Sequence, residues 1–95
     1  MIKLYCPSLS KDVILHCTYK PKHLSAKLFD YETGELLLPV TMSFSATSKD
    51  CAFVNSPEYP WLPEFLVGND LARPTYHSLV KNKKVYSEYK FKKGK

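Results

Sequence analysis

Short segments in which apolar and polar residues alternate are the feature that most constrains how this chain can fold. Ile2, Leu4 and Cys6 share one side of such an alternation, and the same period of two runs through 13–19 and 24–28. Successive side chains of a β-strand point to opposite faces, so this period predicts strands with one buried face. We therefore expect the first half of the chain to form a series of short strands.

The segment Asp30-Tyr31-Glu32-Thr33-Gly34-Glu35 has the composition of a hairpin turn. An Asp side chain can accept hydrogen bonds from the backbone that follows it, and Gly34 can supply a positive φ. Pro39 has no amide hydrogen, so it must lie at an edge, at a bulge or at a non-bonded position of a sheet. The fourth expected strand places on one face Leu38, Val40, Met42 and Phe44.

The second half of the chain mixes strands with one helix. A fifth strand is expected at 51–54, a helix at 61–68 with Pro63 in its first turn, and further strands at 76–80 and 85–92. Gly68 or Asn69 would end the helix in a left-handed conformation. The predicted fold class is α+β, with an antiparallel sheet of five to seven strands and one short helix packed on one face.

Size and composition limit the type of protein. At 95 residues, with 44% hydrophobic and 24% charged residues, the chain is expected to be a single soluble domain spanning 1–95. It has no apolar run near the roughly 20 residues that cross a bilayer, and its amino terminus lacks the order of a secretory signal. Cys6, Cys17 and Cys51 form no C-x-x-C pair. We therefore expect free thiols, a cytoplasmic location and no membrane contact.

Positive charge is concentrated at the carboxyl end of the chain. Residues 81–95 contain seven lysines and one acid, so they carry +6, whereas the whole chain carries +5. Alternation through the last strand puts Val85, Ser87, Tyr89 and Phe91 on one face, and we expect Val85, Tyr89 and Phe91 to point toward the core. The expected outer, partner-binding surface consists of Lys84, Tyr86, Glu88, Lys90 and Lys92, continued by Lys93, with an oppositely charged surface at the hairpin tip from Asp30, Glu32 and Glu35.

Catalytic and metal-binding patterns are not evident. His16 and Cys17 are neighbours on an expected strand and point to opposite faces, so they do not readily bind one metal ion. None of the three glycines precedes a serine or cysteine, as a turn that presents a nucleophile would require. The aromatic residues around Trp61 are typical of a core. We expect no catalytic residues, no cofactor and no metal.

Several short blocks, taken in order, resemble a known family. The blocks are Leu24-x-Ala26-x-Leu28, the hairpin segment 30–35, Cys51-Ala52-Phe53-Val54, Tyr59-Pro60-Trp61, Glu64-Phe65-Leu66, Leu71-Ala72-x-Pro74-Thr75 and Tyr89-Lys90-Phe91. They are similar to a family of small proteins of unassigned function, encoded on plasmids, conjugative elements and phages of gut bacteria. The family commonly reads Asn-Gly-Leu-Ala where this chain has Asn69-Asp70-Leu71-Ala72. That departure is why the helix end is expected at Gly68 or Asn69.

The resemblance implies an accessory protein of a mobile genetic element. Some relatives are regarded as anti-CRISPR proteins that inhibit nucleases of the Cas9 type. The leading hypothesis is thus a non-enzymatic protein that binds and inhibits or modulates a host protein complex. The alternative is a nucleic-acid-binding accessory protein that uses the basic last strand. Lysines without arginines would make such binding weak and unspecific in sequence. A third reading is that the lysines only keep an edge strand soluble. The oligomeric state is left open.

Overall fold

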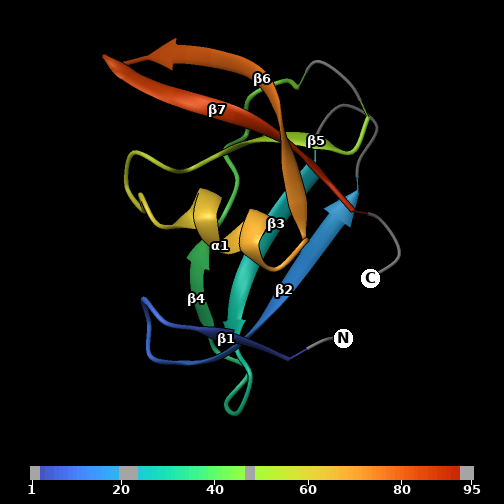
Figure 1. Cartoon of the computed structure of the whole chain (residues 1–95), viewed down its shortest axis with the longest axis vertical. Helices are drawn as coiled ribbons and strands as arrows, with labels where there is room; N and C mark the ends of the chain where they lie inside the picture. The colour runs from blue at the N-terminus through green and yellow to red at the C-terminus, as the bar shows by residue number, and fades with distance from the viewer. Residues whose placement is uncertain (1–2, 20–23, 47–48, 93–95) are drawn as a thin grey trace.

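The computed structural model describes residues 3–19, 24–46 and 49–92 (Figure 1). The α+β class is confirmed, but the expectation of one sheet is wrong, because the strands form two antiparallel sheets. The first sheet has the order β1-β2-β3-β4, and the second has the order β5-β7-β6. The elements are β1 (Leu4–Cys6), β2 (Lys11–Tyr19), β3 (Leu24–Asp30), β4 (Leu36–Pro39), β5 (Cys51–Val54), α1 (Leu62–Gly68), β6 (Ala72–Lys81) and β7 (Lys84–Phe91).

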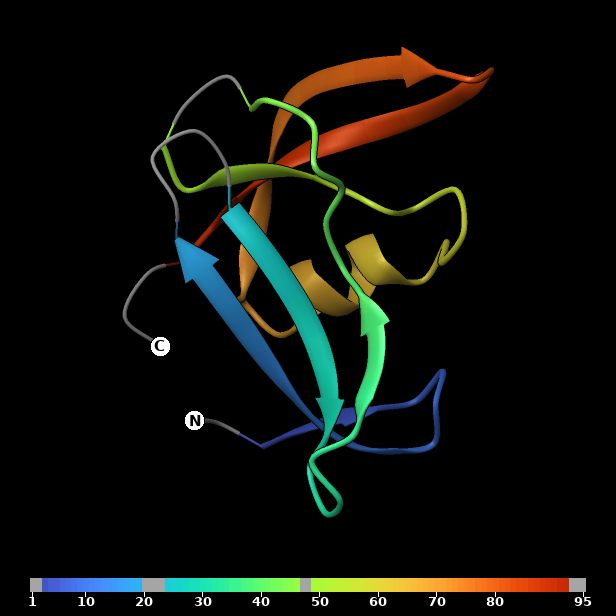
Figure 2. The same ribbon diagram turned by 180° about the vertical axis from the view of Figure 1, so that it is seen from behind.

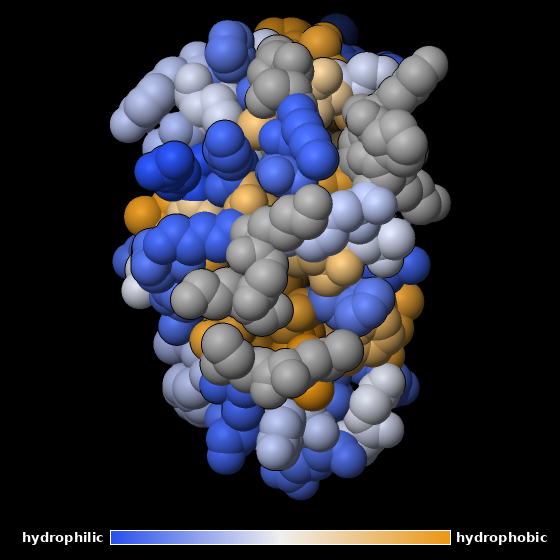
Figure 3. Space-filling view, turned by 90° about the vertical axis from the view of Figure 1, so that its right-hand side faces the viewer, coloured by the Kyte–Doolittle hydropathy of each residue, from blue (hydrophilic) through white to orange (hydrophobic). Residues whose placement is uncertain are grey.

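The first sheet follows the alternation of the sequence closely. In β3, Leu24, Ala26 and Leu28 are buried while Lys27 between them is exposed. The opposite face of this sheet carries the ring pair His16 and Phe29, whose centroids lie 6.2 Å apart. Figure 3 views the molecule from the right-hand side of Figure 1, where hydrophilic residues predominate and apolar residues are visible between them. Ile2 of the first expected strand lies outside the described residues.

The chain changes sheets just after Pro39. Pro39 ends β4, an edge strand, as its missing amide hydrogen requires. Val40 still donates its amide to the Ala26 carbonyl at 2.8 Å, but Met42 donates to Phe53 of β5 at 2.8 Å. The fourth strand expected through Phe44 is therefore wrong in its second half. That half leaves the first sheet and crosses to the second.

Helix α1 is confirmed within one residue of its expected start, and Pro63 lies in its first turn. The predicted left-handed end at Gly68 or Asn69 is wrong, because Asp70 takes that conformation with φ +58°. Asn69 has φ −97°. The Leu71 amide then returns to the Leu66 carbonyl at 2.9 Å, which satisfies a carbonyl of the last turn.

One core joins both sheets and the helix. It includes Val13 and Leu28 of the first sheet, Leu62 and Leu66 of α1, and Phe91 of β7. In Figures 1 and 2, α1 lies across one face of the first sheet, with the second sheet crossing above it. The hairpin between β3 and β4 lies at one end of the molecule and the β6–β7 hairpin at the other. The described helix is too short to cross a membrane.

Candidate partner-binding site: the β6–β7 arm

The distal part of the β6–β7 hairpin, residues 76–87, is called the arm here. It projects from the body at the top of Figures 1 and 2. Asn82 and Lys83 form its turn with φ +52° and +64°. Positive φ at both central positions is the signature of a type I′ turn, which joins paired strands without splaying them. The flanking residues Lys81 and Lys84 are paired in register, so the arm is a regular hairpin at its tip.

One face of the arm is covered by the segment that joins the two sheets. The Phe44 ring lies 5.1 Å from the Tyr86 ring and 6.2 Å from the Phe53 ring, centroid to centroid. The Lys81 ammonium lies 4.9 Å from the centroid of the same Phe44 ring. These contacts bury Tyr86 to 8% exposure. The arm is therefore fastened to the body through an aromatic cluster beneath it.

The other face of the arm is exposed and apolar. Val80 and Val85 are paired across the hairpin and remain 67% and 55% exposed. Alternation places Val85 on the same side of β7 as Tyr89 and Phe91, which are buried. The expectation that Val85 faces the core is wrong because the strand is longer than the core it covers. Residues 76–87 also contain three lysines and no acid.

A bulge forms the root of the arm. Pro74 pairs with Tyr89 and Ser78 pairs with Ser87, so residues 75–77 all lie opposite the single residue Glu88. Tyr76, at the centre of the bulge, has φ +69° and is 91% exposed. A non-glycine residue with positive φ in a strand is strained, and bulges redirect side chains. The bulge thus turns the Tyr76 ring outward.

A buried carboxylate anchors this bulge. Glu88 is fully buried, and the Thr75 hydroxyl donates to its Oε1 at 2.6 Å. His77 Nδ1 lies 3.4 Å from the same oxygen and 3.3 Å from the Thr75 hydroxyl. In a nucleophilic relay the hydroxyl would contact the imidazole nitrogen that the carboxylate does not use. Here the Thr75 hydroxyl and the Glu88 carboxylate both lie near His77 Nδ1. The arrangement therefore lacks the geometry of such a relay, and its contacts stabilise the backbone of the bulge.

Of the residues predicted to form the outer face of the last strand, some are exposed and others are buried. Lys84 and Lys90 are exposed, as expected. Tyr86 and Glu88 were expected on the outer face with them, and this is wrong because Phe44 covers Tyr86 and the Thr75 bulge encloses Glu88. They support the arm from inside and do not form its surface.

The end of the last strand is engaged with the body. The Lys92 ammonium forms an ion pair with Asp70, and its backbone carbonyl accepts a hydrogen bond from the Tyr19 hydroxyl at 3.0 Å. Lys92 is exposed, but these contacts restrict its availability to a partner. Lys93 lies outside the described residues. The basic surface that the structure describes is thus centred on the arm.

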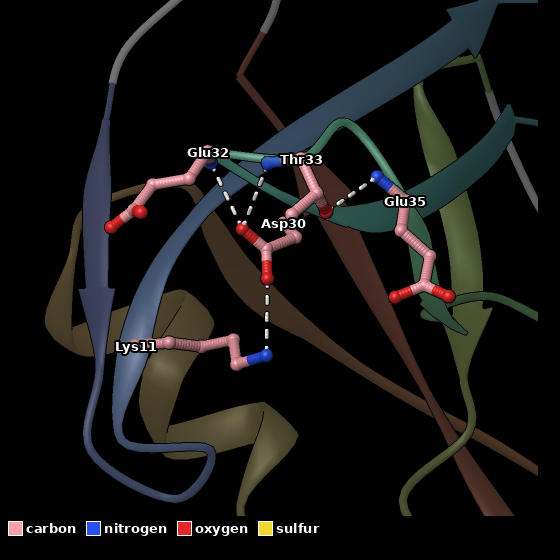
Figure 4. A network of polar contacts seen from close by, with 5 residues as sticks. All are labelled: Lys11, Asp30, Glu32, Thr33 and Glu35. Carbon is pink, nitrogen blue, oxygen red and sulfur yellow. Dashed lines mark hydrogen bonds and ion pairs between the residues drawn. The ribbon is translucent and has the colours of Figure 1, made fainter.

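The hairpin tip, residues 30–35, is an acidic loop held by one of its own acids (Figure 4). Asp30 Oδ1 accepts from the amides of Glu32 and Thr33 at 2.9 and 3.3 Å, and Oδ2 pairs with the Lys11 ammonium at 3.0 Å. The hydrogen bond from Lys11 and those from the backbone lower the Asp30 pKa. Asp30 was expected on the partner-binding surface, and this is wrong because the side chain is only 12% exposed. Glu32 and Glu35 are exposed and point away from Asp30.

The three cysteines are free, as predicted, and Cys6 and Cys51 are buried. Burial raises the pKa of Cys17 to about 11, although a hydrogen bond with Tyr19 opposes the shift. A thiol with this pKa is protonated near neutral pH and is a poor nucleophile. Within 3–19, 24–46 and 49–92, no three His, Cys, Asp or Glu side chains are grouped so that they could hold a metal ion.

Sequence reasoning missed the residues that make the arm distinctive. Tyr76 was placed in a regular strand, and the clamp of Thr75 and His77 on Glu88 was not foreseen. The one available signal was Pro74, which disfavours regular pairing in mid-strand.

No family model, no curated protein and no solved structure matches the chain.

Proposed function

We propose that the protein works by binding a macromolecular partner through the arm, and not by catalysis. The observation that carries this proposal is the exposure of Tyr76, Val80 and Val85 on a hairpin that also contains three lysines and extends past the core. Exposed apolar side chains with polar or charged residues around them are typical of protein interaction sites, and the arm carries both kinds of residue. The rigid turn and the Phe44 contact hold the arm in place before binding, which lowers the entropic cost of association.

The partner we propose is a host protein complex with an acidic surface, and its most specific form is a CRISPR nuclease of the Cas9 type. The choice of nuclease comes from the family resemblance, which implies an accessory protein of a mobile element. The composition of the arm favours a protein partner, because the exposed Val80 and Val85 side chains can pack on an apolar protein surface but gain nothing from contact with phosphate. Its lysines would attract an acidic surface and accelerate association.

The test is a cleavage assay with a purified Cas9-type nuclease and target DNA. The triple variant Tyr76→Ala, Val80→Ser and Val85→Ser should lose protection of the target, because it removes the exposed apolar side chains of the arm. Leu36→Ser is the matched control: Leu36 is also apolar and 50% exposed, but it belongs to β4. If the wild type leaves cleavage unchanged, this nuclease is not the partner. If both variants protect equally, the arm is not the contact surface.

A second candidate function is weak, unspecific binding of nucleic acid. Tyr76 favours it, since a ring that is 91% exposed on the same hairpin as three lysines could stack on a base. Such binding should fall steeply between about 50 and 200 mM salt, because lysines bound to phosphate displace counterions. Lys83→Glu with Lys84→Glu should abolish it in an electrophoretic assay with single-stranded DNA. A protein partner predicts no DNA binding by the isolated chain.

A further inference from the structure

A cavity of about 420 Å³ opens beside α1, away from the arm. The helix contributes one stripe of residues, and the turn between β1 and β2 contributes the facing wall. The lining residues are Tyr5, Pro7, Ser8, Trp61, Glu64, Phe65, Gly68 and Asn69. This volume lies within the range of about 300 to 1,000 Å³ that is usual for pockets that take small ligands.

Three of the lining residues are aromatic, namely Tyr5, Trp61 and Phe65, and one, Glu64, carries a carboxylate. Trp61 is held between two rings, with centroids 6.2 Å from Tyr59 and 6.0 Å from Phe65, both edge-on. This contact fixes the indole at the cavity wall while leaving it partly exposed. Sequence reasoning assigned the aromatic residues around Trp61 to the core, and the structure shows that Trp61 also reaches the surface.

The cavity has an acidic lining that would favour a cation. Among the residues that the structure describes, the lining includes the Glu64 carboxylate but no lysine, arginine or histidine. Aromatic faces attract cations, and a carboxylate beside them adds charge complementarity. Asn69 Nδ2 donates one hydrogen bond to the Phe65 carbonyl at 2.9 Å. The Asn69 amide also carries an oxygen that accepts hydrogen bonds. Carboxylate, amide and hydroxyl acceptors together match a group with several donors.

We propose that this cavity binds the guanidinium of an arginine side chain from a partner protein. A guanidinium is planar, stacks on aromatic rings and presents a fork of N–H donors to a carboxylate, whereas an ammonium is a compact and strongly hydrated charge. In the bound state the guanidinium lies against Trp61 and pairs with Glu64. The site does not depend on the arm, since the two share no residue.

Trp61 is the only tryptophan, so its fluorescence reports occupancy directly. The probe is the peptide acetyl-Gly-Arg-Gly-amide, and the control is the same peptide with citrulline, which keeps the shape but not the charge. We expect a saturable change with arginine and about tenfold weaker binding with citrulline. No saturable change, or equal binding of the two peptides, overturns the proposal. Free L-arginine binding more tightly than the peptide would overturn the assignment to a protein side chain.

Two variants locate the site. Glu64→Gln should weaken arginine binding about tenfold, and Glu32→Gln is the matched control because it removes the same charge at the hairpin tip. Gly68→Leu should block the cavity, since Gly68 lines it and a Cβ added at this position meets no atom within 4 Å. Unchanged affinity in both Glu64→Gln and Gly68→Leu would refute the site. The arm variant above should leave this titration unchanged, so failure of one proposal is distinct from failure of the other.

Discussion

The hairpin tip at 30–35 and the arm at 76–87 are both charged hairpins, but they use charge in opposite ways. At the tip, Asp30 points inward and holds the loop through two amides and Lys11. In the arm, Lys83 and Lys84 stay exposed, and the rigidity comes from aromatic packing beneath them. At the tip, the Asp30 carboxylate therefore stabilises the loop itself, whereas in the arm the Lys83 and Lys84 ammonium groups remain exposed at the surface. Figures 1 and 2 place the two hairpins at opposite ends of the molecule.

This separation changes how a partner could engage both. The chain extends 34 Å along its longest axis, several times the screening length of about 8 Å at physiological salt. The charges of the tip and of the arm are therefore screened from one another and do not form one dipolar patch. The exposed acids Glu32 and Glu35 remain available at the tip for a basic surface. We expect loss of the arm to affect binding more than loss of the tip, because only the arm adds apolar area.

The largest expected effect tests how the arm is held. Tyr86→Ala should reduce the free energy of unfolding by about 3 kcal/mol, because it removes a buried ring and leaves a space beside Phe44. Its neighbour Val85→Ala should change it by less than about 0.5 kcal/mol, since Val85 is exposed. Urea denaturation followed by circular dichroism measures both. Equal effects of the two substitutions would mean that the arm is not anchored on one face.

The error at Tyr86 shows what alternation can and cannot predict. The period of two correctly assigned the residues of β7 to two opposite faces. It carries no information on which face is buried by segments that are distant in the sequence. Phe44 comes from a segment far away in sequence, and Thr75 belongs to a bulge with no strong local signal. The strands of the first sheet were predictable because neighbours in sequence pair there. The order β5-β7-β6 and the aromatic cavity depend on distant contacts.

The second prediction concerns the tip. Asp30→Ala should lower the urea midpoint, because the amides of Glu32 and Thr33 and the Lys11 ammonium lose their acceptor. Asp30→Asn should have a smaller effect, since its amide oxygen can still accept from the backbone. Both effects should be smaller than that of Tyr86→Ala. The control Glu32→Ala removes an exposed carboxylate and should leave the midpoint unchanged; a drop equal to that of Asp30→Ala would contradict the role assigned to Asp30.

Acid should remove the difference between wild type and Asp30→Asn. The Asp30 pKa is lowered in the folded protein, so its ionised form stabilises the fold at neutral pH. That contribution is complete above the ordinary value of 3.8 and is lost as pH falls through the lower folded pKa. Urea midpoints of the two proteins, measured from pH 7 down to pH 2, should therefore converge. A constant difference across this range would mean that the charge of Asp30 is not what stabilises the tip.

The smallest expected effects come from the two turns, and they have opposite signs. Gly34 has φ +77° and open space around it, so Gly34→Ala should cost about 1 kcal/mol through backbone strain alone. Lys83 has φ +64° without being glycine, so Lys83→Gly should stabilise the fold by roughly 0.5 kcal/mol. Thermal denaturation at matched salt measures both. Because Lys83→Gly also removes a charge, Lys83→Gln serves as its control and should not stabilise. If the Lys83→Gly variant were more stable but bound the partner less well, the Lys83 side chain would contribute to binding at the expense of stability.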